Sequence, residues 1–350
     1  MKHTGKRILL GIGLVIAVLG GAAIALFWNE LGTLASFRKA DEHPLYTMTY
    51  RGDYGFSDFL KTGAESDRDI ERFVIKRLLK GIDIDLGITS AGCSAFTAQN
   101  TNGERIFARN FDFDFAPVML LKTTPSDGYA SISIVNLAFA GYDADFLPDS
   151  GLFDRFLTLA APFLPFDGMN EKGVVIALLA VPHAEPPDQP GRVKLNTTTA
   201  IRMILDHAAN VEEALTLLDG YNLYFSGDVE CHYLISDRAG DSAVVEFLEG
   251  EIKITKPEEN HQIATNFIVY QGIIEGEGGT EFERYATIER ALLSSGGVID
   301  ETAAMQLLSD ASIPGRTQWS VVYNQSNGQV TICMGETYEQ VYTYQLERFE

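Results

Sequence analysis

Cys93 is one of only three cysteines in the chain, and its neighbours suit nucleophilic chemistry. It follows the small Ala91-Gly92 dipeptide, which leaves room around the thiol. If the Gly92–Cys93 peptide bond were cut, Cys93 would become the first residue of a new chain, and its own α-amine would serve as the base. The alternative is a buried core thiol, because unpaired cysteine is among the most buried residue types.

Two charged residues follow Cys93 on what reads as the second strand of a β-hairpin. Arg109 stands sixteen residues after Cys93, and Asp112 nineteen residues after it. A cation beside a thiol lowers the thiol pKa, and a carboxylate can orient either an α-amine or the arginine. A structural ion pair between Arg109 and Asp112 is the alternative. Asp112 and Asp114 would also share one face of a strand, yet no second carboxylate pair supports glycoside chemistry.

Other kinds of site find no support in the sequence. The six histidines show no metal-ligand spacing and no HExxH pattern, and a calcium site is equally unsupported. P-loop, GxSxG and dinucleotide-binding patterns are missing as well. We therefore predict no metal and no cofactor. A dyad of Cys93 with a distant histidine stays open, and nothing in the sequence nominates the histidine.

Composition and charge narrow the classes of protein. With 46% hydrophobic and 21% charged residues, a chain of 350 residues can bury a substantial core. Residues 93–350 carry 37 acidic against 15 basic side chains, whereas residues 1–92 carry 11 against 12. Because an acidic surface repels phosphate backbones, we expect no nucleic-acid partner.

The N-terminus predicts membrane attachment and export. Three basic residues precede an uncharged run from Ile8 to Trp28, which spans roughly 30 Å as a helix, the thickness of a bilayer's hydrocarbon core. We expect a signal-anchor in residues 1–28, although Ala23-Ile24-Ala25 also fits the cleavage pattern of a signal peptide. In both cases the remainder is extracytoplasmic. Three cysteines cannot all pair within one exported chain, so at least one thiol is free.

Residues 29–92 form a leader in this interpretation, and it contains one amphipathic helix. Apolar residues recur at helical spacing in "SDRDIERFVIKRLLKGID", with Ser66 or Asp67 able to cap its start and Gly81 its end. From Cys93 the pattern changes to strands, beginning with a hairpin around Thr101-Asn102-Gly103. We therefore expect a second domain over residues 93–350.

Strands and helices alternate in blocks after the hairpin. Three apolar strands, in "VMLLKTT", "YASISIVNLAF" and "GVVIALLAV", precede the helices "TTAIRMILDHAA" and "VEEALTLLDG", the second with a capping box at Asn210 and Glu213. A second strand block, from "CHYLISD" to "HQIATNF", precedes two more helices and three final strands. Two blocks of largely antiparallel strands separated by helices predict an α+β fold, with two packed sheets and helices outside.

The segment after Cys93 resembles the choloylglycine hydrolase family of N-terminal nucleophile (Ntn) hydrolases, which includes bile salt hydrolases and penicillin V acylases. The family has a nucleophilic cysteine and a hairpin that ends in "GRNMD", and this chain reads "FARNFD" at the same spacing. Further similar motifs follow in order: "DGMNEKG" at 167–173, "HYLISDRAGDSAVVE" at 232–246, "IATNF" at 263–267, "FERYATIERAL" at 282–292 and "TQWSVVYN" at 317–324.

This resemblance covers about residues 93–345 and implies a four-layer αββα sandwich behind the N-terminal membrane helix. It implies Cys93 as nucleophile, Asn266 as an oxyanion-hole residue and Arg284 as a second active-site arginine. The family's other oxyanion residue, about ten positions after Asn170, is often asparagine or tyrosine. Here Ala180 stands in its place, which suffices if the backbone N–H is the donor. The long leader is more similar to those of self-cleaving acid ceramidase and acyltransferase relatives.

The resemblance thus implies an exported amidohydrolase that first cuts its own Gly92–Cys93 bond and releases the leader. Arg109 would favour the thiolate and Asp112 would fix the α-amine. The substrate would be a small N-acyl amide, for which bile amides, penicillin V, acyl-homoserine lactones and N-acyl lipids all suit. Alternatives are an acyltransferase that uses an amine acceptor and an inactive, membrane-tethered binding domain. Assembly into a homo-oligomer is left open.

Overall fold

The computed structural model describes residues 27–79, 92–151, 154–270 and 279–347, together with residues 272 and 349. The predicted membrane run lies outside the described residues, apart from Phe27 and Trp28. Among the helices of the described part, none is both long and apolar enough to cross a bilayer.

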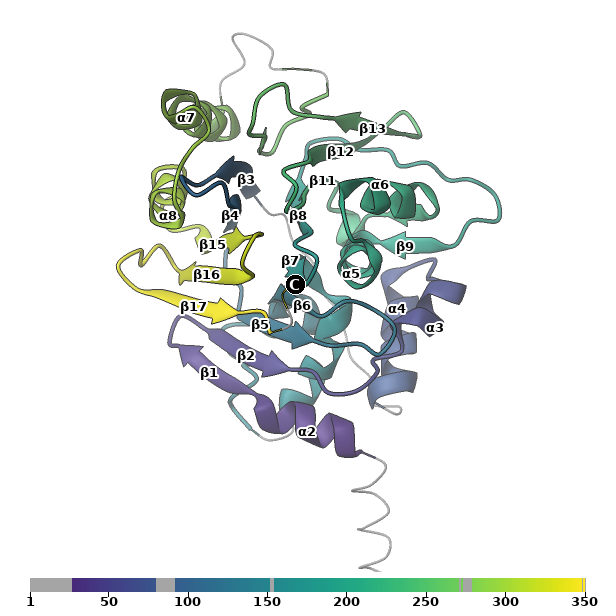
Figure 1. Ribbon diagram of the computed structural model, residues 1–350. Helices are drawn as coiled ribbons and strands as arrows, with labels where there is room; N and C mark the ends of the chain where they lie inside the picture. Colours follow the sequence, from purple (N-terminus) through teal and green to yellow (C-terminus); the bar gives the residue numbers. More distant parts are fainter. Residues whose placement is uncertain are drawn as a thin grey trace, which may run out of the picture.

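Two large sheets form the centre of the molecule (Figure 1). Neighbouring strands in both are antiparallel, except that β2 and β5 are parallel. The nine-stranded sheet has the order β1 (Arg38–Asp41), β2 (Leu45–Thr49), β5 (Val118–Thr123), β6 (Ser131–Asn136), β7 (Pro165–Asn170), β8 (Val175–Ala180), β11 (Cys231–Ser236), β12 (Ser242–Leu248) and β13 (Glu251–Thr255). The six-stranded sheet has the order β14 (Ile263–Ala264), β3 (Gly92–Gln99), β4 (Arg105–Asp112), β15 (Thr317–Asn324), β16 (Gln329–Met334) and β17 (Val341–Gln345).

Helices cover the outer face of each sheet, which makes the α+β arrangement four layers deep (Figure 1). Helices α5 (Thr197–His207) and α6 (Val211–Asp219) lie on the nine-stranded sheet, where α5 packs against β7 and β8. Helices α7 (Thr280–Ser295) and α8 (Glu301–Asp310) lie on the six-stranded sheet against β3, β4 and β15. The two helix pairs therefore bury the apolar outer faces of the sheets, and the inner faces pack together.

The predicted helices after residue 197 and the Cys93 hairpin are confirmed. At the hairpin turn Gly103 has φ of 83°, a conformation that glycine adopts without strain. The cap of α6 differs in detail from a capping box, because the Glu213 carboxylate accepts from the Ala209 backbone N–H and the Asn210 side-chain NH₂ instead of from the Asn210 backbone N–H. A capping box with both bonds occurs at Asn196 and Thr199, at the start of α5.

The strand blocks predicted from the sequence do not each make one sheet. Instead β3 and β4 pair with the last strands of the chain, while β5 to β8 pair with β11 to β13. Strand β7 was not expected, and neither was the short parallel pair β9 (Lys194–Asn196) and β10 (Asn222–Tyr224). Short 3-10 turns fill several connections: Leu137–Ala140, Asp154–Phe163 and Ser226–Asp228.

Residues 27–79 pack against the rest of the described chain and contribute two strands to the nine-stranded sheet. They form α2 (Trp28–Ser36), β1, β2, α3 (Phe56–Thr62) and α4 (Asp67–Val74), which continues as a π-helix over Ile75–Leu79. Strand β2 extends the nine-stranded sheet through its pairing with β5. Tyr54, Phe56 and Phe59 are buried against Phe163 of the following domain. The expected helix end at Gly81 lies outside the described residues.

Candidate active site

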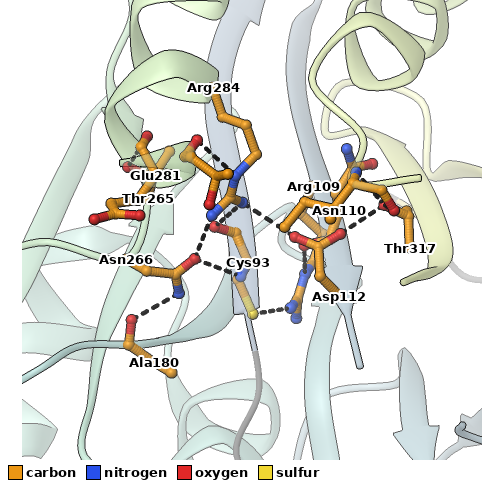
Figure 2. A network of polar contacts seen from close by, with 12 residues as sticks. Cys93, Arg109, Asn110, Asp112, Ala180, Thr265, Asn266, Glu281, Arg284 and Thr317 are labelled. Atoms are coloured by element: carbon orange, nitrogen blue, oxygen red, sulfur yellow. Dashed lines mark hydrogen bonds and ion pairs between the residues drawn. The ribbon is translucent and has the colours of Figure 1, made fainter. Parts of the chain in front are cut away.

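The antiparallel pairing of β3 and β4 brings Cys93 and Arg109 together. Cys93 lies opposite Phe111, and Arg109 is two residues from Phe111 on the same strand. Because side chains alternate along a strand, Cys93, Phe111 and Arg109 point to one face, between the two sheets. The Nη2 atom of Arg109 lies 3.0 Å from the Sγ atom of Cys93 (Figure 2). The prediction that Arg109 lies on the paired strand is confirmed.

Arg109 forms its ion pair with Asp167 and not with Asp112. Its Nη1 atom lies 2.8 Å from Oδ2 of Asp167, and both side chains are fully buried. Tyr323 donates its hydroxyl to the other Asp167 oxygen. The alternative of a structural Arg109–Asp112 pair is therefore wrong, since the strand geometry turns Arg109 toward β7. The Nη1 nitrogen of the guanidinium thus binds Asp167, while Nη2 is directed at the thiol.

The Cys93 thiol is completely buried, and burial raises its pKa above the ordinary thiol value. Three groups act in the opposite direction: the Arg109 guanidinium, the backbone N–H of Ala180 and the Arg284 guanidinium. The Asp112 carboxylate adds to the rise. The thiol is thus protonated at neutral pH, although cationic and N–H groups already surround the position where a thiolate would form.

Asp112 and Arg284 form a second buried ion pair beside Cys93. Arg284 reaches from α7 and places Nη1 3.1 Å from Oδ2 of Asp112 and 2.6 Å from the Cys93 carbonyl oxygen (Figure 2). Thr317 donates its hydroxyl to Oδ1 of Asp112 at 2.6 Å. Burial raises the pKa of Asp112, whereas Arg284 and Thr317 lower it. Arg284 is 6% exposed, so it is not a solvated charge on the helix surface.

Asn266 links the Cys93 backbone to Arg284 and Ala180. Its Oδ1 accepts from the Cys93 N–H at 2.7 Å and from Nη2 of Arg284 at 2.6 Å. Its Nδ2 donates to the Ala180 carbonyl oxygen at 2.7 Å. Two donors on one side and a carbonyl on the other fix the orientation of the amide. Asn266 thus holds the N–H of the Gly92–Cys93 bond while its NH₂ lies beside Ala180.

Gly92 and Ala180 complete the group of residues that the sequence nominates. Gly92 lies opposite Asp112 in the β3–β4 register. A Cβ atom at Gly92 would lie 3.3 Å from the Asp112 Cβ and 3.8 Å from Oδ1 of Asn266. All the site residues predicted from the sequence therefore lie close together around Cys93. Their catalytic roles stay predictions.

Comparisons with known proteins identify the family of this chain. The sequence pattern of the linear amide C–N hydrolases, choloylglycine hydrolase family, matches residues 93–275, slightly more than half of the chain. The chain belongs to the choloylglycine hydrolase family. A penicillin V acylase from Pectobacterium atrosepticum is 30% identical over 111 residues, which are 29% of this chain and 29% of that protein.

Solved structures were also compared with this choloylglycine hydrolase family member, and one of them bears on its fold. A mutant conjugated bile acid hydrolase from Clostridium perfringens has a TM-score of 0.50 at 16% identity, over 73% of this chain and 92% of that one. Penicillin V acylase from Agrobacterium tumefaciens has a TM-score of 0.48 at 17% identity, over 73% and 86%. The bile acid hydrolase likeness supports the Ntn-hydrolase fold, and identity this low indicates nothing about substrate.

The structure adds two site residues that sequence reasoning did not nominate. Asp167 pairs with Arg109, and Thr317 binds Asp112. Both belong to motifs that resemble the family, at 167–173 and 317–324. Asp167 could have been found as a single carboxylate within an apolar stretch, since such residues are rarely buried without a partner. Asp114 differs from the expectation of a shared face with Asp112, since β4 ends at Asp112 and the Asp114 side chain is exposed beside Arg316. No group of metal-ligating side chains is found among the described residues.

If the Gly92–Cys93 bond is cut as the sequence predicts, we expect Gly92→Val to slow the cut by about 10- to 100-fold, because the added atoms displace this bond from Asp112 and Asn266. Gly92→Ala, with a single added carbon, should slow it less. The intact mass of purified protein, followed over time, measures the fraction cut. Cleavage of Gly92→Val at the wild-type rate would show that this close approach is unimportant.

Proposed function

We propose that this chain is a cysteine Ntn amidohydrolase, which cuts its own Gly92–Cys93 bond and then hydrolyses the linear amide bond of a small N-acyl substrate. The observation that carries the proposal is the 3.0 Å contact between Nη2 of Arg109 and Sγ of Cys93, inside a site that also fixes the Cys93 N–H. A buried cation aimed at a thiol favours the thiolate and so the nucleophile.

Self-cleavage in this proposal proceeds through a thioester. The Cys93 thiol loses its proton and attacks the Gly92 carbonyl carbon, the C–N bond breaks, and the proton passes to the Cys93 nitrogen, which becomes an α-amine. Water then hydrolyses the thioester and frees the thiol and a Gly92 carboxylate. Asn266 supports this step, because its Oδ1 holds the Cys93 N–H. Arg284 contacts the Cys93 carbonyl oxygen on the other side of the residue.

Substrate hydrolysis follows the same chemistry with the new amine as base. The α-amine of Cys93 takes the thiol proton, the thiolate attacks the amide carbonyl, and the amine product leaves with a proton. Water completes the turnover. The Ala180 N–H bonds to the thiol, and the Asn266 NH₂ donates to the Ala180 carbonyl oxygen. Both would stabilise the oxyanion, each donor contributing roughly 3 kcal/mol. Asp112 lies opposite Gly92, the residue before Cys93, and would hold the new amine in place.

A cavity of about 20 Å³, which has room for about one water molecule, adjoins the site and has a mostly apolar surface. Its wall includes Phe139, Phe166, Leu178 and Cys231. The Phe166 carbonyl accepts from Arg109, and Cys231 lies opposite Ala180 in the β8–β11 register, so the cavity adjoins the site. An acyl group is too large for this volume, so the cavity indicates only that this side of the site is apolar, which favours hydrocarbon or aryl acyl groups over charged ones.

Two further features of the proposal concern location. The uncharged run over residues 8–28 supports membrane anchoring and export of residues 29–350. A fusion of a reporter enzyme to the C-terminus, read out on each side of the membrane, tests the orientation.

The test of the proposed function uses the full chain and a panel of N-acyl amides. Purified protein is offered aryl-acetyl, medium-chain acyl and charged acyl amides, with and without an added acceptor amine. We expect release of free acid and amine, fastest with apolar acyl groups. A product in which the acceptor carries the acyl group would instead identify an acyltransferase. A chain that stays uncut and hydrolyses none of the amides would refute the proposal that the protein is an enzyme.

We expect the rate of self-cleavage to rise with pH from about pH 5 to 9, close to tenfold per unit below the thiol pKa. The sign follows from burial, which raises the pKa of Cys93 and leaves little thiolate at neutral pH. Arg109→Met removes a group that lowers this pKa and should slow cleavage further at each pH. Intact-mass time courses give the rates. A rate that falls with rising pH would contradict the assigned nucleophile.

A further inference from the structure

A buried histidine–glutamate pair lies outside the machinery described so far. His232 on β11 and Glu246 on β12 stand on neighbouring antiparallel strands, and the His232 Nδ1 atom lies 3.1 Å from Oε1 of Glu246. His232 is 0% exposed and Glu246 1% exposed. The Nε2 atom of His232 has no hydrogen-bond partner in the part of the chain that the structure describes. Buried ionisable groups are costly unless they are bound, so this pair calls for a role.

The Glu246 carboxylate binds the backbone of a separate segment. Oε1 accepts from the Val269 N–H and Oε2 from the Tyr270 N–H, each at 2.7 Å. Both amides follow β14 and belong to no regular helix or strand. Each carboxylate oxygen therefore takes one amide, and His232 supports the carboxylate through a third contact. Bonds from N–H groups to a charged acceptor are stronger than neutral ones.

The segment that Glu246 holds carries Asn266. On one side, Ala264 of β14 pairs with Ala95 of β3, two residues from Cys93. On the other side, Glu246 binds Val269 and Tyr270, so Asn266 lies between two fixed points. Between them, the ring of Phe267 stacks on Phe282 at 4.6 Å. A side chain on an irregular segment needs such support, because its position tolerates little displacement during catalysis.

We propose that Glu246, held by His232, is a positioning residue that sets Asn266 against Cys93 and Ala180. The proposal rests on the proposed function for its catalytic consequence, since Asn266 acts there on the oxyanion. The effect would pass from the Glu246 carboxylate on β12 to the backbone amides of Val269 and Tyr270, and from there along the segment to Asn266. The Asn266 side-chain amide contacts the Cys93 N–H, the Arg284 guanidinium and the Ala180 carbonyl oxygen. Glu246 itself does not touch the thiol or the scissile bond.

The test compares Glu246→Ala and Glu246→Gln with Asp237→Ala. Asp237 lies at the opposite end of the β11–β12 pair, is buried, and binds the Ala239 and Val211 amides, so it matches Glu246 chemically but is remote from Asn266. Amide hydrogen exchange of the peptide 263–270 reads the segment without any need for activity. We expect exchange there to quicken about tenfold or more in Glu246→Ala, and not in Asp237→Ala.

The same variants are then assayed after self-cleavage. For Glu246→Ala we expect kcat to fall about tenfold with little change in KM, as for loss of an interaction made in the transition state. In an Asn266→Ala background, Glu246→Ala should cause no further fall, because the two act through one contact. Glu246→Gln, which keeps one accepting oxygen, should be intermediate and serves if the alanine variant does not fold.

Two results would overturn the positioning role. One is unchanged exchange of peptide 263–270 in both Glu246 variants. The other is an equal fall in kcat with and without Asn266, which would indicate a general loss of stability. If the wild-type chain hydrolyses none of the amides, the proposed function fails, and the exchange comparison still decides whether Glu246 fixes this segment.

Discussion

Cys93→Ala protein will be recovered as a single uncut chain without amidase activity, whereas wild-type protein will begin in part at Cys93. The Sγ atom is the only atom at this position that can attack the Gly92 carbonyl, and its removal leaves Arg109 without a thiolate to stabilise. Loss of a covalent nucleophile lowers turnover by about 10⁴- to 10⁶-fold. N-terminal sequencing and intact mass report the cut, and product release reports the activity.

Cys333→Ala is the matched control for this result. Cys333 is also a buried, unpaired cysteine, but it lies on β16, away from the Gly92–Cys93 bond. This variant should be cut and should hydrolyse substrate as wild type does. If Cys93→Ala is still cut between residues 92 and 93, a contaminating protease makes the cut. If it retains full activity, the assignment of the nucleophile is wrong.

Asp167→Ala will lower the free energy of unfolding by about 3–5 kcal/mol, the usual effect of leaving one charge of a buried pair unpaired. Arg109 is fully buried at 2.8 Å from Asp167, so water cannot replace the lost carboxylate. Tyr323 would lose its acceptor as well. Denaturant unfolding, analysed at constant slope, gives the change in stability.

Asp114→Ala is the control for the Asp167 variant. Asp114 also pairs with an arginine, at 3.1 Å from Arg316, but its side chain is 78% exposed. Exposed pairs contribute about 0–1 kcal/mol, so its loss should hardly matter. A double variant, Arg109→Met with Asp167→Leu, removes both buried charges and should recover much of the stability, yet remain inactive. Recovery of activity in the double variant would contradict the role of Arg109.

The sequence was sufficient for the local parts of the site. Cys93 and Arg109 face each other because they belong to one hairpin, whose Asn-Gly turn and alternating pattern are visible in the residues. The helices α5 to α8 were predictable from apolar spacing and capping residues for the same reason. Asn266 and Arg284 lie far from Cys93 in sequence, and only the family resemblance nominated them.

Long-range pairing could not be predicted. Nothing in the stretch Leu45–Thr49 indicates that it will lie parallel to β5, because a strand's pattern gives its buried faces and not its partner. Strand β7 was not predicted because Asp167, Gly168 and Asn170 interrupt its apolar pattern. Asp167 is needed to pair with Arg109, and the Asn170 side chain binds backbone groups of α5 and of the following turn. The partner of Arg109 was missed with it.

The place of β2 in the nine-stranded sheet changes what self-cleavage would produce. A cut after Gly92 leaves residues 27–79 with their strand still hydrogen-bonded to β5 and with Tyr54 still bound to the buried Asp206. We expect the smaller piece to remain as a permanent subunit, so that both pieces coelute in native gel filtration and separate only in denaturant. The mature protein would then be a heterodimer encoded by one gene, with its nucleophile on one polypeptide and the predicted membrane anchor on the other.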